Sequence, residues 1–215
     1  MKSMVKAYTL FICCFAMMCC YSQNQRFRPV LSLGLVGSQV DGDTYSGYNK
    51  SGLMAGLGVN HQLGEKMEFE LAITYIQKGA RKNSNPAKGD LNYYLFRLHY
   101  VEVPLMFKYN YKKIKLEAGL SYAYLFSYSE ENAAVGYYTT NPPLHRDVSY
   151  DLGCGYKISD NFLVNLRYSY SMLPIRPYSG QNVYYGNLWN KMFNKGLDNN
   201  LLVLSLNYLL NPAKD

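Results

Sequence analysis

Cysteine is almost missing from the body of this chain. Four of the five cysteines, Cys13, Cys14, Cys19 and Cys20, lie near the start, and only Cys154 follows them. One remaining thiol cannot form a disulfide within the chain. If the chain is exported, its stability must therefore come from a large hydrophobic core or from a membrane.

Residues 1–22 have the layout of a secretory signal peptide. Lys2 and Lys6 precede an apolar run that ends at Cys20, and small and polar residues follow. We expect cleavage after this segment, which leaves one mature domain over 23–215. A membrane anchor is an alternative, but the apolar run is shorter than the roughly 20 residues of a spanning helix. Lipid attachment at one of the last two leader cysteines is a second alternative.

Clusters of positive charge are also lacking. The chain carries a net charge of +7, which falls to +5 without Lys2 and Lys6. No run of Lys or Arg accompanies this mild excess, so nucleic acid is not an expected partner. Metal-ligand spacing is missing as well, and we expect neither a metal nor a cofactor.

Long apolar runs and helix-period stripes are scarce beyond the leader, whereas alternation with period two is widespread. The stretch "MEFELAITY" sets Met67, Phe69 and Leu71 on one face, and Glu68 and Glu70 lie on the other. Such alternation is typical of strands with one apolar face. Eight segments follow it, at about 29–39, 52–63, 67–76, 97–109, 114–126, 147–158, 162–172 and 199–209.

The connections between these segments alternate in length. Tight turns at 64–66, 110–113 and 159–161 alternate with long polar loops at about 40–51, 77–96, 127–146 and 173–198. Outer-membrane barrels show this asymmetry, with short turns in the periplasm and long loops outside. Strands of about 10 to 13 residues, which rise about 3.3 Å per residue, also cross an apolar band of roughly 25 Å when they are tilted.

A soluble eight-stranded barrel of the lipocalin type would also alternate, so side-chain size must decide which face is inside. The polar face carries most of the strand glycines, Gly34, Gly56, Gly58, Gly119, Gly153 and Gly155. Small residues fit the narrow interior of an eight-stranded barrel. Tyrosines lie on the apolar faces toward strand ends, as in an aromatic girdle; they are Tyr75, Tyr109, Tyr124, Tyr156, Tyr170 and Tyr208. The sequence thus predicts an all-β fold, an eight-stranded antiparallel up-and-down transmembrane β-barrel.

Two stretches of the sequence resemble a known family. They are "YIQKG" at 75–79 and "YVEVPLMFKY" at 100–109. Both are similar to signature stretches of the outer-membrane β-barrel domain family, sometimes called porin-like, of Gram-negative bacteria. The resemblance implies a place in the outer membrane and no particular activity; some members of the family are associated with protein secretion or gliding machinery.

Charged side chains are expected inside the barrel. Inward positions carry five acidic and four basic residues, Glu68, Glu70, Glu102, Glu117, Asp151, Lys108, Lys115, Lys157 and Arg167. Because the acidic and basic residues are nearly equal in number, we expect them to form ion pairs with one another; an unpaired charge in so narrow a space costs several kcal/mol. Counting from the turn at 159–161, we expect a buried cluster of Arg167 with Asp151 and Glu102, and a second group of the other six nearer the periplasm. A structural plug is the plain interpretation, and a proton or ion path is the alternative.

No catalytic arrangement emerges from the sequence. The chain has three histidines, His61, His99 and His145, and no Ser or Cys shares a strand face with any of them at two-residue spacing. Cys154 falls on the apolar side that would meet lipid. We therefore expect that the protein is not an enzyme.

The long loops are the remaining candidates for binding. In loop 77–96 the candidates to pair with lipopolysaccharide phosphates are Lys78, Arg81, Lys82 and Lys88. In loop 173–198 the candidates to contact a protein or glycan are Tyr184, Tyr185 and Trp189. A solvated loop and a lid packed on the barrel are the respective alternatives.

Two function classes stay open. The first is a monomeric, non-enzymatic barrel that acts as a structural or binding component of the cell envelope, in contact with outer-membrane lipid and lipopolysaccharide and with an envelope or secretion protein as a candidate partner. The second is a small-solute or ion pore. An eight-stranded interior filled with paired charges disfavours a wide channel, so we favour the first.

Pro104 is an irregular feature of the fourth expected strand. Proline has no backbone N–H to donate, and a closed barrel has no free edge strand on which such a residue is harmless. The sequence therefore predicts a local interruption of the strand ladder at this position.

Overall fold

The computed structural model describes residues 27–43, 47–133, 136–137, 141–177 and 196–210. The expected signal peptide at 1–22 lies outside these residues, as do Tyr184, Tyr185 and Trp189, so the predictions made for them stay predictions. Within the described ranges, no helix has the length and apolar character needed to cross a membrane.

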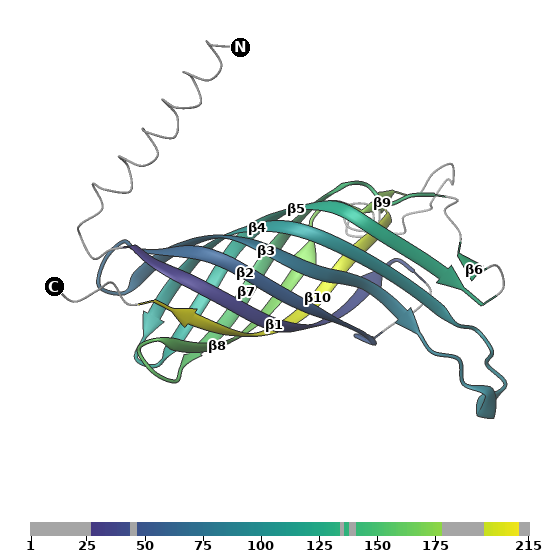
Figure 1. The fold of residues 1–215 in the computed structure, drawn as a ribbon, viewed down its shortest axis with the longest axis horizontal. Coiled ribbons are helices and arrows are strands. Elements are labelled where there is room, and N and C mark those ends of the chain that lie inside the picture. Colours follow the sequence, from purple (N-terminus) through teal and green to yellow (C-terminus); the bar gives the residue numbers. More distant parts are fainter. Residues whose placement is uncertain (1–26, 44–46, 134–135, 138–140, 178–195, 211–215) are drawn as a thin grey trace, which may run out of the picture.

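Eight long strands dominate the described residues, and they pair antiparallel with their neighbours in the chain (Figure 1). Strand β1 also pairs with β10, from Val30↔Leu209 to Asp41↔Asp198, and this pairing closes the ring. The predicted eight-stranded, antiparallel, up-and-down barrel is confirmed. The strands are β1 (Phe27–Asp41), β2 (Lys50–Gln62), β3 (Met67–Lys82), β4 (Tyr94–Tyr111), β5 (Ile114–Asn132), β7 (Arg146–Lys157), β8 (Phe162–Ser171) and β10 (Gly196–Leu209).

Three short elements lie at one end of the barrel. They are the strands β6 (Gly136–Tyr137) and β9 (Arg176–Pro177) and the 3-10 helix η1 (Pro86–Lys88). Figure 1 shows all three at the end opposite the tight turns, such as the one between β7 and β8. In outer-membrane barrels the tight turns face the periplasm, so these elements mark the outer end.

Several strands extend further toward the outer end than the alternation predicted. Strand β3 continues to Lys82, β4 already begins at Tyr94, and β5 runs to Asn132. Backbone pairing between β3 and β4 holds as far as Lys82↔Tyr94, beyond the last regularly apolar positions. The ladder depends on backbone groups rather than on side-chain polarity, which is why polar sequence concealed these strand ends.

The two faces of the wall have the orientation that side-chain size predicted. Leu33 is 68% exposed, whereas Glu102 in the same wall is 4% exposed. A protein folded for water would bury the leucine and expose the carboxylate. The apolar row therefore forms the outer surface of the barrel, and the row that carries the charges faces the lumen.

The outer half of the lumen contains a hydrophobic core that the sequence analysis did not anticipate. Inward-facing apolar side chains from six strands pack against one another there, together with Ile175 from the segment before β9. Four of the largest, Phe96, Leu98, Tyr100 and Leu125, are completely buried. The charged side chains thus share the interior with an apolar plug.

The ladder interruption predicted at Pro104 is present on one side of β4. Pairing with β3 runs to Leu71↔Leu105 and resumes only at Thr74↔Glu102. On the other side, Pro104 pairs in register with Ser121 of β5. The missing N–H therefore opens the β3 side of the wall over two positions without shifting the register.

Candidate functional site

The lumen charges form stacked groups, and the group nearest the periplasm is centred on Glu68. Its carboxylate pairs with Lys115 at 2.5 Å. It also accepts hydrogen bonds from the amides of Asn60, at 2.7 Å, and Asn110, at 2.6 Å. Three side chains from three other strands thus converge on Glu68, and one of them, Lys115, belongs to the predicted second group.

The next group joins two bases and two acids. Lys108 lies 2.7 Å from Glu70 and 3.5 Å from Glu117. Arg167 donates from Nε to Glu117 at 2.7 Å. Burial makes each of these charges costly without a partner, and the four neutralise one another.

The expected partners of Arg167, Asp151 and Glu102, were only partly right. Asp151 lies near enough to interact with the charge of Arg167. The ion pair in the structure, however, is with Glu117 on β5, two strands away, and Glu102 pairs with Lys78 instead. Register explains the reach, because Glu117, Gly153 and Arg167 lie in one row across β5, β7 and β8. Gly153 has no side chain to obstruct the guanidinium, and a Cβ there would lie 2.5 Å from Glu117 Oε1.

Asp151 lies one inward position closer to the outer end than Gly153 on β7, and it accepts a hydrogen bond from the hydroxyl of Ser121. Both side chains are buried. Asp151 belongs to the lumen set as predicted, but its described hydrogen bond is to a neutral partner rather than to Arg167.

Lys78 is the centre of a group that lies within the apolar plug, between the core residues Ile76 and Ala80 of β3. Its Nζ pairs with Glu102 at 2.7 Å and with Asp147 at 3.0 Å, and the side chain is completely buried. Asp147 also accepts from Ser171 at 2.7 Å and from Asn199 at 2.8 Å. Placing Lys78 among the loop residues was therefore a wrong prediction.

The sequence did contain a signal for this group. Glu68 and Glu70 face the lumen, and the same parity continues through Thr74 to Lys78. Extending the alternation beyond the last apolar residue would have placed Lys78 inside. Asp147 shares the parity of Asp151 on β7 in the same way.

A fifth group closes the outer end of the described lumen. Arg176 donates to both oxygens of Glu130, at 3.2 and 2.7 Å, and the Tyr94 hydroxyl donates to Glu130 at 2.7 Å. The guanidinium also lies 4.8 Å from the ring centre of Phe96. These contacts join β9, which follows β8 in the chain, to β5 at the outer opening of the barrel.

The remaining basic candidates lie toward the two ends of the barrel. Lys157 lines the same pocket at the periplasmic mouth as Glu68 and Lys115, as predicted, but its ion pair is with Asp160 across a turn at 2.9 Å. Lys82 pairs with Asp90 at 2.9 Å. Hydrogen bonds from Lys82 and from the Asn92 backbone hold the pKa of Asp90 below its usual value.

Two other loop candidates have local roles in the described chain. Arg81 is exposed, and its Nε donates to Asn83 at 2.7 Å. The backbone of Lys88 ends η1. Neither observation tests a contact with lipopolysaccharide.

Each histidine contacts an aromatic ring. His61 stacks on Phe27 with ring centres 4.2 Å apart, and the rings of His145 and Tyr124 are stacked at 5.7 Å. His99 Nδ1 lies 2.7 Å from the hydroxyl of Tyr75. Among the residues that the structure describes, no group of three His, Cys, Asp or Glu side chains is placed to hold a metal ion.

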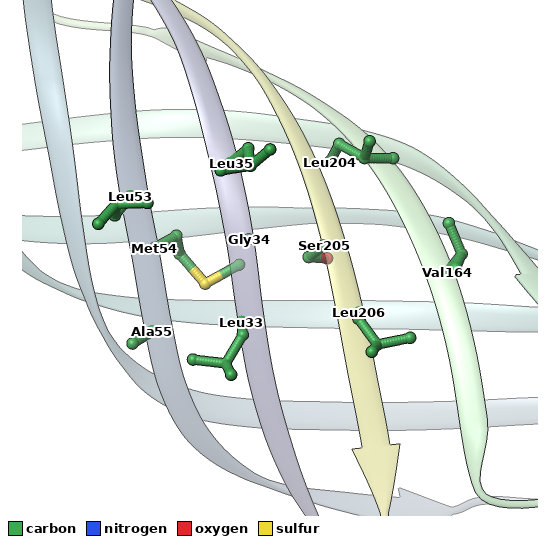
Figure 2. A pocket seen from close by; sticks show the side chains of 10 residues that line it. All are labelled: Leu33, Gly34, Leu35, Leu53, Met54, Ala55, Val164, Leu204, Ser205 and Leu206. Carbon is green, nitrogen blue, oxygen red and sulfur yellow. The ribbon is translucent and has the colours of Figure 1, made fainter.

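The outer wall has an apolar hollow of about 610 Å³ over β1, β2, β8 and β10. Figure 2 shows leucines of β1 and β10 on either side of Gly34 and Ser205, and these two small residues form the bottom of the hollow. Its walls include Leu33, Leu35 and Leu204. Such a surface fits hydrocarbon, which is the environment expected for the outside of a membrane barrel.

Comparison with known proteins agrees with this geometry. Among solved structures, the barrel is similar to Ail, the attachment invasion locus protein of Yersinia pestis, crystallised with the heparin analogue sucrose octasulfate; the TM-score is 0.50 and the identity 12%, over 86% of this chain and 99% of that one. Neisserial surface protein A is similar with a TM-score of 0.47 and 10% identity, over 86% of this chain and 97% of that one. At such an identity the similarity to Ail concerns the fold alone. No curated protein sequence matches the chain.

The sequence itself matches a family over residues 21–175, described as an outer membrane protein beta-barrel domain. This range covers most of the chain and includes the two stretches, 75–79 and 100–109, that carried the resemblance. The predicted family and location are confirmed. The chain belongs to the outer membrane protein beta-barrel domain family and is a protein of the outer membrane.

Proposed function

We propose that this protein is a closed, non-enzymatic barrel that serves as a structural or binding component of the outer membrane. One observation carries the proposal: ion pairs and an apolar core fill the lumen at successive heights. The alternative function, a small-solute or ion pore, needs a continuous aqueous path through the same space.

The ion pairs support a closed lumen because they cross it. Lys78 joins β3 to β4 and to β7, and Arg167 joins β8 to β5. A solute that passed would have to separate these pairs, and separation of a buried pair leaves an uncompensated charge that costs about 3–5 kcal/mol. The interior of an eight-stranded barrel has room for side chains and little else.

The apolar core supports the same conclusion at the outer end. Phe96, Leu98 and Tyr100 have no exposed surface, and Val203 and Leu201 face them from the β10 side. Dense apolar packing offers water no hydrogen bonds, so a wetted path through this region would be unstable.

The non-enzymatic part of the proposal rests on the histidines and the described carboxylates. His61, His99 and His145 contact rings or backbone, and the lumen acids bind bases, amides or hydroxyls. None of these contacts in the described chain pairs a histidine with a Ser or Cys, the arrangement that would activate a nucleophile. We infer that the working surfaces are the outer wall and the outer loops, in contact with lipid, lipopolysaccharide or an envelope protein, and that the self-closed ring acts as a monomer.

A solute-uptake assay tests the proposal. Proteoliposomes that contain the full mature chain are expected to swell in small sugars or glycerol no faster than protein-free liposomes. A known open porin, reconstituted in parallel, supplies the positive control. Swelling that depends on the amount of this protein would replace the closed-barrel proposal with the pore.

A further inference from the structure

The outer surface of the barrel carries a polar pocket near the outer ends of β2, β3 and β4. It has a volume of about 260 Å³, several times the roughly 30 Å³ that one water occupies. Its lining is strongly basic and contains no carboxylate: Lys50, Ser51, Gln77, Arg81, Leu95, Arg97 and His99.

The pocket begins where the apolar band of the wall ends. Along the outward row of β4, apolar residues extend from Tyr109 to Val101, and His99 and Arg97 follow. The rings of Tyr75, His99 and Phe126 lie next to one another at this border, with centres 6.1 to 6.2 Å apart. Aromatic girdles mark the zone of lipid headgroups, so the pocket opens at headgroup height.

The basic groups of the pocket lack acidic partners. None of the ion pairs between described residues includes Lys50, Arg81 or Arg97. Lys50 is only 6% exposed, and its Nζ donates to the carbonyl of Ser51 at 3.1 Å. Like charges that share a small pocket repel one another, and a bound anion would remove the repulsion.

A chain of hydrogen bonds also directs a donor toward this pocket. The backbone N–H of Leu53 donates to Gln77 Oε1 at 3.3 Å, which fixes the orientation of the amide. Gln77 Nε2 then donates to the Tyr75 hydroxyl at 2.8 Å. That hydroxyl can donate its own proton to His99 Nδ1, 2.7 Å away, so a neutral His99 carries its N–H on Nε2.

We propose that this pocket binds a phosphate group of an outer-leaflet lipid, as in phosphorylated lipopolysaccharide. Arg97, Lys50 and Arg81 supply charge-assisted hydrogen bonds to the phosphate oxygens, and His99 adds a neutral donor. The acyl chains of the same lipid lie along the apolar wall below Tyr75. The inference deepens the proposed function, on which it rests for the view that the outer wall is a working surface.

Native mass spectrometry of the full mature chain, released from detergent micelles, tests the site. The probes are bisphosphorylated lipid A, its dephosphorylated form and inorganic phosphate. The variants are Arg97→Gln, at an exposed position, and Lys50→Gln with Arg97→Gln. The control, Lys66→Gln with Lys113→Gln, removes the same charge from exposed positions at the opposite end of the barrel.

Arg97→Gln alone is expected to bind bisphosphorylated lipid A about tenfold more weakly than the wild type, because a hydrogen bond to a charged group contributes about the 1.4 kcal/mol that corresponds to a factor of ten. The double variant should bind more weakly still. The control should bind like the wild type. Dephosphorylated lipid A should bind wild type and variants equally weakly, and inorganic phosphate should compete only at much higher concentration than the lipid.

Equal binding of bisphosphorylated lipid A by wild type and Arg97→Gln would overturn the site. Equal binding of the two lipid A forms by the wild type would contradict the role of phosphate. Free phosphate that binds as tightly as the lipid would contradict the proposal that the bound phosphate belongs to a lipid. The proposed function fails separately, by solute uptake through the wild-type barrel, which this binding assay does not measure.

Discussion

At the scale of single residues, Lys78 shows what the buried charges contribute. It lies between Glu102 and Asp147, and no part of its side chain is exposed. Both acids would be left without a cation if Lys78 were removed. Its energetic role is therefore to neutralise two carboxylates in a region that water does not reach.

Lys78→Met should strongly destabilise the barrel. The substitution keeps the length of the side chain but leaves Glu102 and Asp147 uncompensated, and we expect the free energy of unfolding to fall by about 3–5 kcal/mol. Urea titration of the barrel in lipid vesicles, followed by far-UV circular dichroism, measures the change. Lys82→Met is the matched control, because the Lys82–Asp90 pair is partly exposed and should contribute at most about 1 kcal/mol. A similar loss for both variants would contradict the account.

Gly153 is the second residue on which the charge network depends. Gly153→Ala places a methyl group against the Glu117 carboxylate, and we expect a loss of about 1–3 kcal/mol in the free energy of unfolding. Gly64→Ala is the control, because a Cβ at Gly64 meets no atom within 4 Å. Unfolding midpoints in urea compare the two, and an unaffected Gly153→Ala variant would show that the row leaves more room than the structure indicates.

Part of the set of buried charged residues could be predicted from the sequence, but most of their partners could not. Period-two alternation correctly placed Glu117, Asp151 and Arg167 in the lumen. The pairing depended on the stagger between strands and on the missing side chain of Gly153. Long side chains reach two strands across a narrow barrel, so residue counting along one hairpin cannot identify the atoms they meet.

At the scale of elements, the strands follow from local pattern, whereas their outer ends do not. The tight turns fixed where β2, β3, β7 and β8 meet, because short connections leave little freedom in register. Toward the loops the side chains become polar on both faces while the backbone ladder continues. Polar composition therefore signalled loops where the chain is still in the sheet.

Pro104→Ala tests the cause of the interrupted ladder. The substitution restores an N–H that can donate toward β3, so we expect new hydrogen-exchange protection at residue 104 and at its neighbours in β3, with stability unchanged or slightly higher. Amide exchange followed by NMR in micelles reads this directly. Rapid exchange at position 104 of the variant would mean that the gap has another cause.

At the scale of the whole molecule, ring closure and a filled lumen belong together. Pairing of β1 with β10 leaves no unpaired strand edge in the ring, as the hydrocarbon interior of a membrane requires. The same closure fixes a small diameter, and apolar and ion-paired side chains occupy the space inside. The apolar filling of the outer half was not predicted from the sequence. Inward residues such as Leu98 and Ile76 are as apolar as outward ones, and only their odd or even position along the strand distinguishes the two faces.

Single-channel recording in planar lipid bilayers tests the closed lumen most directly. After insertion of the mature wild-type chain, verified by heat-dependent mobility of the recovered protein on gels, we expect no current steps above the baseline of the bare bilayer in high salt. Regular, reproducible steps that scale with the amount of inserted protein would contradict the closed barrel and establish a conducting pore.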